Sequence, residues 1–176
     1  MWRLIAWIVS RKPVADWIIR RAMKRPFKHL DGYMERWWIF NEFGANKVNK
    51  IPWLPAIRLH HILRPDLERH LHDHPWNART IILRGWYIEQ RLNEGPPVEI
   101  FNDPPYETRV FRRYPGDTAR LSFGEYHKII DVSEGGVWSM FIMRGYQSDW
   151  GFLVDGEKIP HKQYEYAKQQ ETKNAV

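Results

Sequence analysis

Three histidines alternate with other residues in the stretch RHLHDHPWNARTIILRG, residues 69–85, just before a run typical of a β-strand: His70, His72 and His74. Residues two apart share a face of an extended chain, so these imidazoles are expected on one face. Neutral imidazole is a ligand for Fe, Mn, Ni, Cu and Zn. The spacing therefore indicates a metal site, or else an unusual piece of surface.

The composition is that of a folded chain without cysteine chemistry. The 176 residues are 43% hydrophobic and 15% aromatic, enough for one domain with a core. The absence of cysteine excludes disulfides, cysteine-ligated zinc and cysteine nucleophiles. The apolar run LIAWIV, residues 4–9, is far shorter than the roughly 20 residues of a membrane span. We therefore expect a cytoplasmic protein.

The positive charge of the chain is concentrated at its N-terminus. The net charge is +6, yet residues 1–30 hold eight Lys or Arg and a single acid, Asp16, so this arm carries +7. The rest of the chain sums to −1. The main body is therefore not expected to bind nucleic acid.

Residues 1–34 are predicted to form a basic, amphipathic helical extension in two pieces, with Pro13 in the first turn of the second helix. An apolar stripe that borders a basic face follows at helical spacing: Val14, Trp17, Ile18 and Arg21. Such a helix can lie on an anionic membrane surface, or it can pack on its own domain. We expect packing on the domain, because a β-domain with apolar outer positions needs a cover.

From about residue 35 the pattern changes to short runs of β type separated by clusters of Gly, Pro, Asn and Asp. The runs are RWWIF (36–40), AIRLHHILR (56–64), RTIILRGWYIEQRL (79–92), PVEIF (97–101), ETRVFRRY (107–114), TARLSF (118–123), YHKIIDV (126–132), VWSMFIMR (137–144) and DWGFLV (149–154). Many short strands with turn signals predict an all-β sandwich or barrel over residues 35–165. Residues 166–176 are predicted to be a polar tail after a short helix.

The longest of these runs reads as two strands joined by a two-residue turn at Arg84-Gly85, since glycine readily adopts a positive φ. A hairpin with that turn predicts three cross-strand pairs: Ile82 with Tyr87, Thr80 with Glu89, and Ala78 with Arg91. These pairs would share the inner face with His72 and His74, because the side-chain period of a strand is two. Ile81 and Leu83 would lie on the outer face, under the N-terminal helices.

Two motifs in this chain resemble those of the cupin superfamily. The first cupin motif has the form H-x-H, three or four residues, E, six residues, G. His72, His74 and Gly85 match it, and Ala78 stands at the position of the expected Glu. The second resembles P-x-G-x-x-H, read here in SFGEYH, residues 122–127, with Gly124 and His127 retained. YPGD, residues 114–117, is a turn common in these domains.

The resemblance covers roughly residues 35–165. More narrowly, LHDHPW, ILRGWYIE and DWGF look like a set of short cupins from bacterial and phage genomes. The resemblance implies a double-stranded β-helix, a small jelly roll, with the N-terminal helices as an extension. It also implies His72, His74 and His127 as three ligands of one divalent transition metal. Iron is the first candidate, with Zn, Mn or Ni as alternatives, and the resemblance implies a homodimer.

The missing Glu at Ala78 leaves several arrangements open. The site can be a three-His site, as in cupins of the thiol dioxygenase type. Alternatively Glu89, predicted to point inward from the neighbouring strand, approaches the metal or acts as acid and base. Arg91 or Arg79 would favour an anionic substrate through bidentate hydrogen bonds, and Tyr87 is expected to line the pocket.

The remaining polar residues of these runs receive weaker assignments. One of His60 and His61 must face inward, and a buried, hydrogen-bonded imidazole is expected there. His161, in IPHKQY, is a candidate to close the pocket. Asp73 has the wrong parity to share a metal with its neighbours, so it is expected to turn or cap the loop before Pro75.

The function that these features favour is a non-haem metalloenzyme, oxygenase-like, acting at a three-His site on a small substrate, for which an anion is a candidate. With another metal the same site supports isomerisation or hydrolysis. The alternative is a non-catalytic cupin that binds a sugar or an acid, or a sensor. A third hypothesis is an interaction protein docked through residues 1–30.

Overall fold

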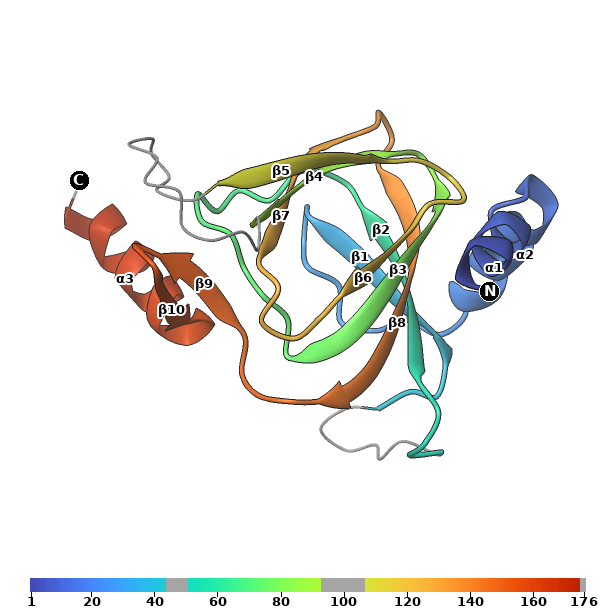
Figure 1. Cartoon of the computed structure of the whole chain (residues 1–176), viewed down its shortest axis with the longest axis horizontal. Coiled ribbons are helices and arrows are strands. Elements are labelled where there is room, and N and C mark those ends of the chain that lie inside the picture. Colours follow the sequence, from blue (N-terminus) through green and yellow to red (C-terminus); the bar gives the residue numbers. More distant parts are fainter. Residues whose placement is uncertain (44–50, 93–106, 175–176) are drawn as a thin grey trace.

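The computed structural model describes residues 1–43, 51–92 and 107–174, and Figure 1 shows the arrangement of the chain. The helices are α1 (Trp2–Val9), α2 (Lys12–Ala22) and α3 (His161–Asn174). The strands are β1 (Met34–Phe40), β2 (Ala56–Ile62), β3 (Trp76–Arg84), β4 (Tyr87–Leu92), β5 (Thr108–Arg113), β6 (Thr118–Leu121), β7 (His127–Val132), β8 (Val137–Tyr146), β9 (Gly151–Val154) and β10 (Glu157–Pro160). The predicted strand at residues 97–101 lies outside the described residues.

Two antiparallel sheets form the body of the protein. One has the strand order β1-β2-β8-β3-β6 and the other β5-β4-β7. Their inner faces pack on each other: Ile62, Ile82 and Val137 of the first sheet contact Tyr87 and Ile129 of the second. The fold is all-β, a jelly roll whose interior lies between the two sheets (Figure 1).

The N-terminal helices cover the outer face of the five-stranded sheet. Buried Ala15, Ile18 and Ile19 of α2 pack in one cluster with Ile81 and Leu83 of β3. The apolar run at residues 81–83 is thus buried on both faces, since Ile82 points inward. A strand covered on both sides needs a continuous apolar run rather than an alternating one, which is what TIIL supplies.

The predicted β3–β4 hairpin is wrong, although Ile81 and Leu83 face outward and Ile82 faces inward, as predicted. Strand β3 pairs with β6 and β8, whereas β4 belongs to the other sheet. The chain turns at Gly85, with φ +69°, and crosses from one sheet to the other. Ile82 and Tyr87 still meet, because residues that face each other across a sandwich interior are buried as well as residues paired side by side.

The C-terminal part forms a small unit at the end of the molecule opposite α1 and α2 (Figure 1). Strands β9 and β10 make a hairpin, and α3 packs on it. Helix α3 extends to Asn174, well past the boundary at residue 165 that the sequence suggested. None of the helices in the described ranges is both long and apolar enough to span a bilayer.

Candidate metal centre

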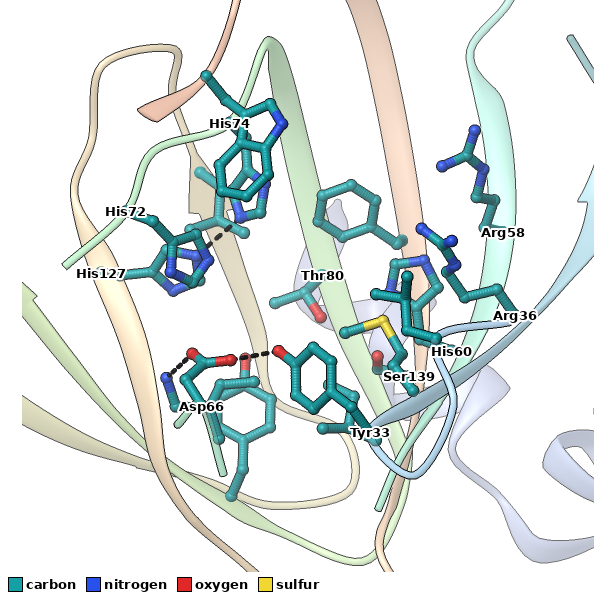
Figure 2. Close-up of a pocket in the computed structure, with 18 of the residues that line it drawn as sticks. Tyr33, Arg36, Arg58, His60, Asp66, His72, His74, Thr80, His127 and Ser139 are labelled. Carbon is teal, nitrogen blue, oxygen red and sulfur yellow. Dashed lines mark hydrogen bonds between the residues drawn. The ribbon is translucent and has the colours of Figure 1, made fainter. Parts of the chain in front are cut away.

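His72, His74 and His127 converge on one wall of the interior. One nitrogen from each lies within 4.8 Å of the others, and His74 Nε2 is 2.8 Å from His127 Nε2. Figure 2 shows the three rings gathered on the same side of the cavity. Within the described residues they are the only group of three potential ligands that meets this spacing.

The backbone brings two of these ligands together directly. His72 and His127 form an isolated antiparallel bridge, in which each backbone N–H donates to the carbonyl of the other at 2.9 Å. His72 also forms a bridge with Phe152 of β9. His72 therefore lies between β7 and β9, outside the named strands, and its position depends on both.

Asp73 anchors the segment between the first two ligands. Because side chains alternate along an extended chain, it points away from the face that carries His72 and His74. Its fully buried carboxylate accepts hydrogen bonds from Gly151 N at 2.7 Å and from Lys158 Nζ at 2.6 Å. It was expected to turn or cap the loop before Pro75; in the structure it fastens that loop to β9 and β10.

The three side chains fit a divalent transition metal. Burial, followed by the charges of neighbouring histidines, lowers the pKa of His72 to about 4 and holds the pKa of His74 well below its usual range. Both rings are therefore neutral at pH 7, and a neutral ring has a lone pair to offer. Two nitrogens that bind one ion at about 2.1 Å in a right-angled arrangement lie about 3 Å apart. The 2.8 Å between His74 and His127 is close to that separation.

Glu89 contacts the ring of His127 on the side away from the cavity and is not part of the cavity lining. Its carboxylate is fully buried and lies 2.9 Å from His127 Nδ1. It also pairs with Arg91 at 2.9 Å and with Arg113 at 3.1 Å. Burial alone would raise the pKa of Glu89, but the hydrogen bonds and charges of His127 and Arg91 outweigh burial and lower that pKa to about 2. This carboxylate orients the ring so that Nε2 faces the other histidines.

The arginines proposed from the sequence as anion contacts do not line the cavity. Arg91 donates to Glu89, to Glu125 and to the carbonyl of Arg120. Arg79 lies on the outer face, where its guanidinium is 4.9 Å from the ring of Trp2 and 3.1 Å from Thr118 Oγ1. The predicted cross-strand pair of Arg91 with Ala78 is wrong, because β3 and β4 do not form a hairpin. Arg91 pairs instead with His127, between β4 and β7. Tyr87 does line the cavity and is buried.

The other histidines serve different purposes. His60 faces the cavity, and His61 faces outward, stacked on Trp138 with ring centroids 4.0 Å apart. The buried imidazole of His60 was expected to be hydrogen-bonded, but its Nε2 has no partner. His70 Nδ1 lies 2.9 Å from the hydroxyl of Tyr164. His161 stacks on Trp150, a lining residue, and so sits one layer behind the cavity wall.

The cavity itself has a volume of about 240 Å³. Its lining includes Thr80, which the sequence placed on the inner face, and polar residues that the sequence did not single out: Tyr33, Arg36, Arg58, Asp66 and Ser139. In the same lining, the hydroxyl of Tyr33 donates to Asp66, whose other oxygen accepts from Ile129 N at 2.7 Å. One signal was available for the arginines: Arg58 has the parity of His60 within the otherwise apolar run AIRLHHI.

Comparisons with known proteins give no match in sequence but several in structure. No protein-family model and no curated protein matches the chain. The oxalate decarboxylase of Lactobacillus farciminis, solved as a formate complex, aligns at a TM-score of 0.53 and 14% identity, over 82% of this chain and 36% of its own. Vicilin from hazelnut, Corylus avellana, aligns at 0.53 and 8% identity, over 82% and 38%.

The oxalate decarboxylase of Bacillus subtilis, a protein with Mn(II) centres, aligns at a TM-score of 0.50 and 15% identity, over 76% of this chain and 31% of its own. The chain thus spans between 31% and 38% of the length of these three structures. Identities this low establish architecture only, and these proteins share the double-stranded β-helix of the cupins. The chain has the cupin fold, with a three-histidine cluster at the wall of its interior cavity.

Proposed function

We propose that this protein is a metal-dependent enzyme of cupin type, in which His72, His74 and His127 hold one divalent transition metal. The observation that carries the proposal is the convergence of three imidazoles on the wall of a cavity of about 240 Å³. Three protein ligands leave coordination positions free for water or substrate, as catalytic sites require. The cavity is smaller than the roughly 300–1,000 Å³ of pockets for drug-sized ligands, which suits a small substrate.

Iron is the first candidate for the metal, and an oxygenase-like reaction the first candidate for the chemistry. When bound, such an ion activates a substrate or O₂, whereas Zn, Mn or Ni would support isomerisation or hydrolysis through Lewis acidity. Glu89 acts in this proposal as a positioning residue, because it reaches the site through the ring of His127. Asp66 and Tyr33 are the lining pair through which a proton can be held and moved.

Elemental analysis tests the metal assignment. Untagged protein purified without chelator is compared with His72→Ala, His127→Ala and, as a matched control, His70→Ala, whose ring contacts Tyr164 instead of the cluster. We expect near-stoichiometric metal in the wild type and the control and none in the other two. Iron would support the oxygenase and direct O₂-consumption assays, whereas Zn, Mn or Ni would support non-redox chemistry at the same site.

A non-catalytic cupin that binds a sugar or an acid is the second candidate. It is favoured by the position of Glu89, since the residue expected to be the acid and base is tied to His127, Arg91 and Arg113 away from the cavity. A wild-type protein that holds no metal even after reconstitution would overturn the enzyme proposal in favour of this one.

A further inference from the structure

We infer that Arg36 and Arg58 form an oxyanion subsite in the cavity, on the wall opposite the three histidines. The ligand of that subsite is a small organic acid with a carboxylate or phosphate group. Figure 2 shows both guanidiniums on the side of the cavity that faces the histidine cluster. The claim that this acid is the substrate rests on the proposed function. The claim that the cavity binds such an acid rests only on the residues that line the cavity.

Arg58 is a buried cation without an acidic partner. Its side chain comes from β2 and is only 6% exposed, and its Nε has no hydrogen-bond partner. Across the described ranges, no Asp or Glu oxygen lies within 4 Å of the guanidinium of Arg58 or Arg36. Natural proteins rarely bury a cation in this way unless something else compensates its charge.

Aromatic rings compensate part of the charge of Arg58. The guanidinium carbon lies 4.1 Å from the ring centroid of Phe27 and 4.4 Å from that of Trp38. Stacking satisfies the faces of a guanidinium, but the N–H groups point outward in its plane and still need acceptors. The rings therefore fix the position of the guanidinium and leave its N–H groups available to a ligand.

Arg36 adds a second positive charge to the same wall. Its Nε donates to the carbonyl of Lys28 at 2.7 Å, and this bond fixes the side chain while leaving the terminal nitrogens for another acceptor. Burial and then the charge of Arg36 lower the pKa of Arg58 to about 9. Both guanidiniums remain charged at pH 7, so the wall carries two positive charges that an anion would relieve.

His60 supplies a neutral donor beside the two cations. It is buried, lines the cavity, and its Nε2 has no partner. Burial, together with the charges of Arg58 and Arg36, lowers the pKa of His60 to about 3, so the ring is neutral and does not add to the charge. The two guanidiniums of Arg36 and Arg58, together with a neutral imidazole N–H of His60, match the several acceptor oxygens of a carboxylate or phosphate group.

Calorimetric titration of metal-reconstituted protein tests the subsite. The probes are succinate and glycerol 3-phosphate, and the uncharged succinamide and glycerol are their controls. The variant is Arg58→Met, and the matched control is Arg79→Met, a guanidinium that stacks on Trp2 outside the cavity. We expect at least one of the acids to bind, with affinity reduced at least about tenfold in Arg58→Met and unchanged in Arg79→Met.

Thermal unfolding gives a second readout that does not depend on choosing the right acid. Because no carboxylate compensates the buried charge of Arg58 and the rings offset only part of it, Arg58→Met is expected to raise the Tm of the ligand-free protein. A lowered Tm, or equal binding of acids by wild type and Arg58→Met, would overturn the subsite. Metal content measured on the same samples separates the two proposals. If the protein holds no metal even after reconstitution but still binds the acid, the subsite is retained and the proposal of a metal-dependent enzyme is refuted.

A second, independent observation concerns α1, which leaves an apolar stripe in solvent although its other face packs on the barrel. Leu4, Trp7 and Ile8 are 62%, 54% and 44% exposed, and their spacing places them on one side of the helix. Isolated exposed apolar residues are ordinary, but a contiguous stripe marks a contact surface. Arg11 continues it, with its guanidinium 3.8 Å from the ring centroid of Trp7.

The geometry points to docking of this α1 face on an anionic lipid surface. The stripe belongs to an arm of eight Lys or Arg and one acid, and that acid, Asp16, already pairs with Lys12 and Arg84. Exposed Trp and Leu beside basic residues are the composition of helices that lie in the membrane interface. A positively charged rim also disfavours pairing of this face with a second copy of itself.

Vesicle flotation tests the docking surface. We expect the protein to float with phosphatidylcholine vesicles that contain 30% phosphatidylglycerol, and not with pure phosphatidylcholine. Trp7→Gln should reduce binding at least about tenfold, whereas Trp53→Gln, which removes an 81% exposed tryptophan elsewhere, should not. Absence of flotation, or a dimer in light scattering that Trp7→Gln dissociates, would overturn the lipid assignment.

Discussion

The ring of His127 is held at Nδ1 by the carboxylate of Glu89, at 2.9 Å, and so presents Nε2 to the other histidines. Glu89 is thus a structural neighbour of the site, although its position in the sequence suggested a residue inside the cavity. The same carboxylate compensates Arg91 and Arg113, so the orientation of the ligand and the stability of the three-stranded sheet depend on one buried charge.

Glu89→Gln is expected to weaken metal binding by about 10- to 100-fold, because the amide no longer fixes the tautomer of His127. The variant should also lose several kcal/mol of stability, of the order of 3–5 kcal/mol, since two arginines lose their partner. A competition titration with a metal chelator measures the affinity. Glu125→Gln is the matched control, because Glu125 also pairs with Arg91 but does not contact His127. Equal affinities for the two variants would contradict the role assigned to Glu89.

The stability of the metal-free protein is expected to rise with pH between about pH 3 and 6.5. Burial lowers the pKa of His60 to about 3, so over this range the unfolded chain binds a proton that the folded protein does not. Each such histidine contributes a slope of about 1.4 kcal/mol per pH unit, and the contribution is lost as the pH falls below about 6.5. Urea unfolding at pH 5 and pH 7.5, with chelator present, measures the difference. His60→Gln should make the difference smaller, and an unchanged difference would show that His60 titrates normally.

Lys158→Met is expected to loosen the loop that carries His72 and His74, because it leaves the buried carboxylate of Asp73 without its cation. Lys158 is partly exposed, so the expected loss is about 1–3 kcal/mol rather than the full value of a buried pair. Chemical unfolding measures the loss. The control is Lys168→Met, which removes a surface pair with Glu68 and should change stability by less than about 1 kcal/mol. Similar losses in the two variants would refute the anchoring role of Asp73.

Gly85→Ala is expected to destabilise the crossing between the two sheets by more than about 2 kcal/mol. A Cβ there would lie 2.5 Å from both Gly136 O and Ser133 Oγ, and φ is +69°. Gly32→Ala separates the two contributions, because Gly32 also has a positive φ, +64°, but nothing lies within 4 Å of its Cβ position. The control should show only the backbone strain, about 1–2 kcal/mol. Equal losses would mean that the close approach at Gly85 is relieved elsewhere.

Much of the fold could be predicted from local patterns. The strands of both sheets fall on the predicted runs of β type, Pro13 lies in the first turn of α2, and Gly85, Gly116 and Gly124 all have positive φ. Two of the three candidate ligands, His72 and His74, were identifiable because H-x-H on an extended chain places both rings on one face. The third ligand came from the resemblance to cupin motifs.

Sheet membership and the far wall of the cavity could not be predicted in the same way. A turn at Gly85 is compatible with a hairpin and with a crossing, and only the packing of Ile82 on Tyr87 across the interior distinguishes them. Arg58 shares the parity of His60 in β2, but the sequence does not say which face of that strand points inward, and Arg36 has no such companion in β1. Their neighbours in space, Phe27 and Trp38, come from segments whose contact depends on the whole barrel.

The bridge between His72 and His127 makes two ligands part of one backbone ladder. Each amide donates to the carbonyl of the other residue, so separating these ligands requires both hydrogen bonds to break together. For the metal site that we propose, we expect release of the ion to be coupled to local opening of this bridge. Metal exchange with solution and deuterium exchange at these two amides should consequently proceed at a common rate.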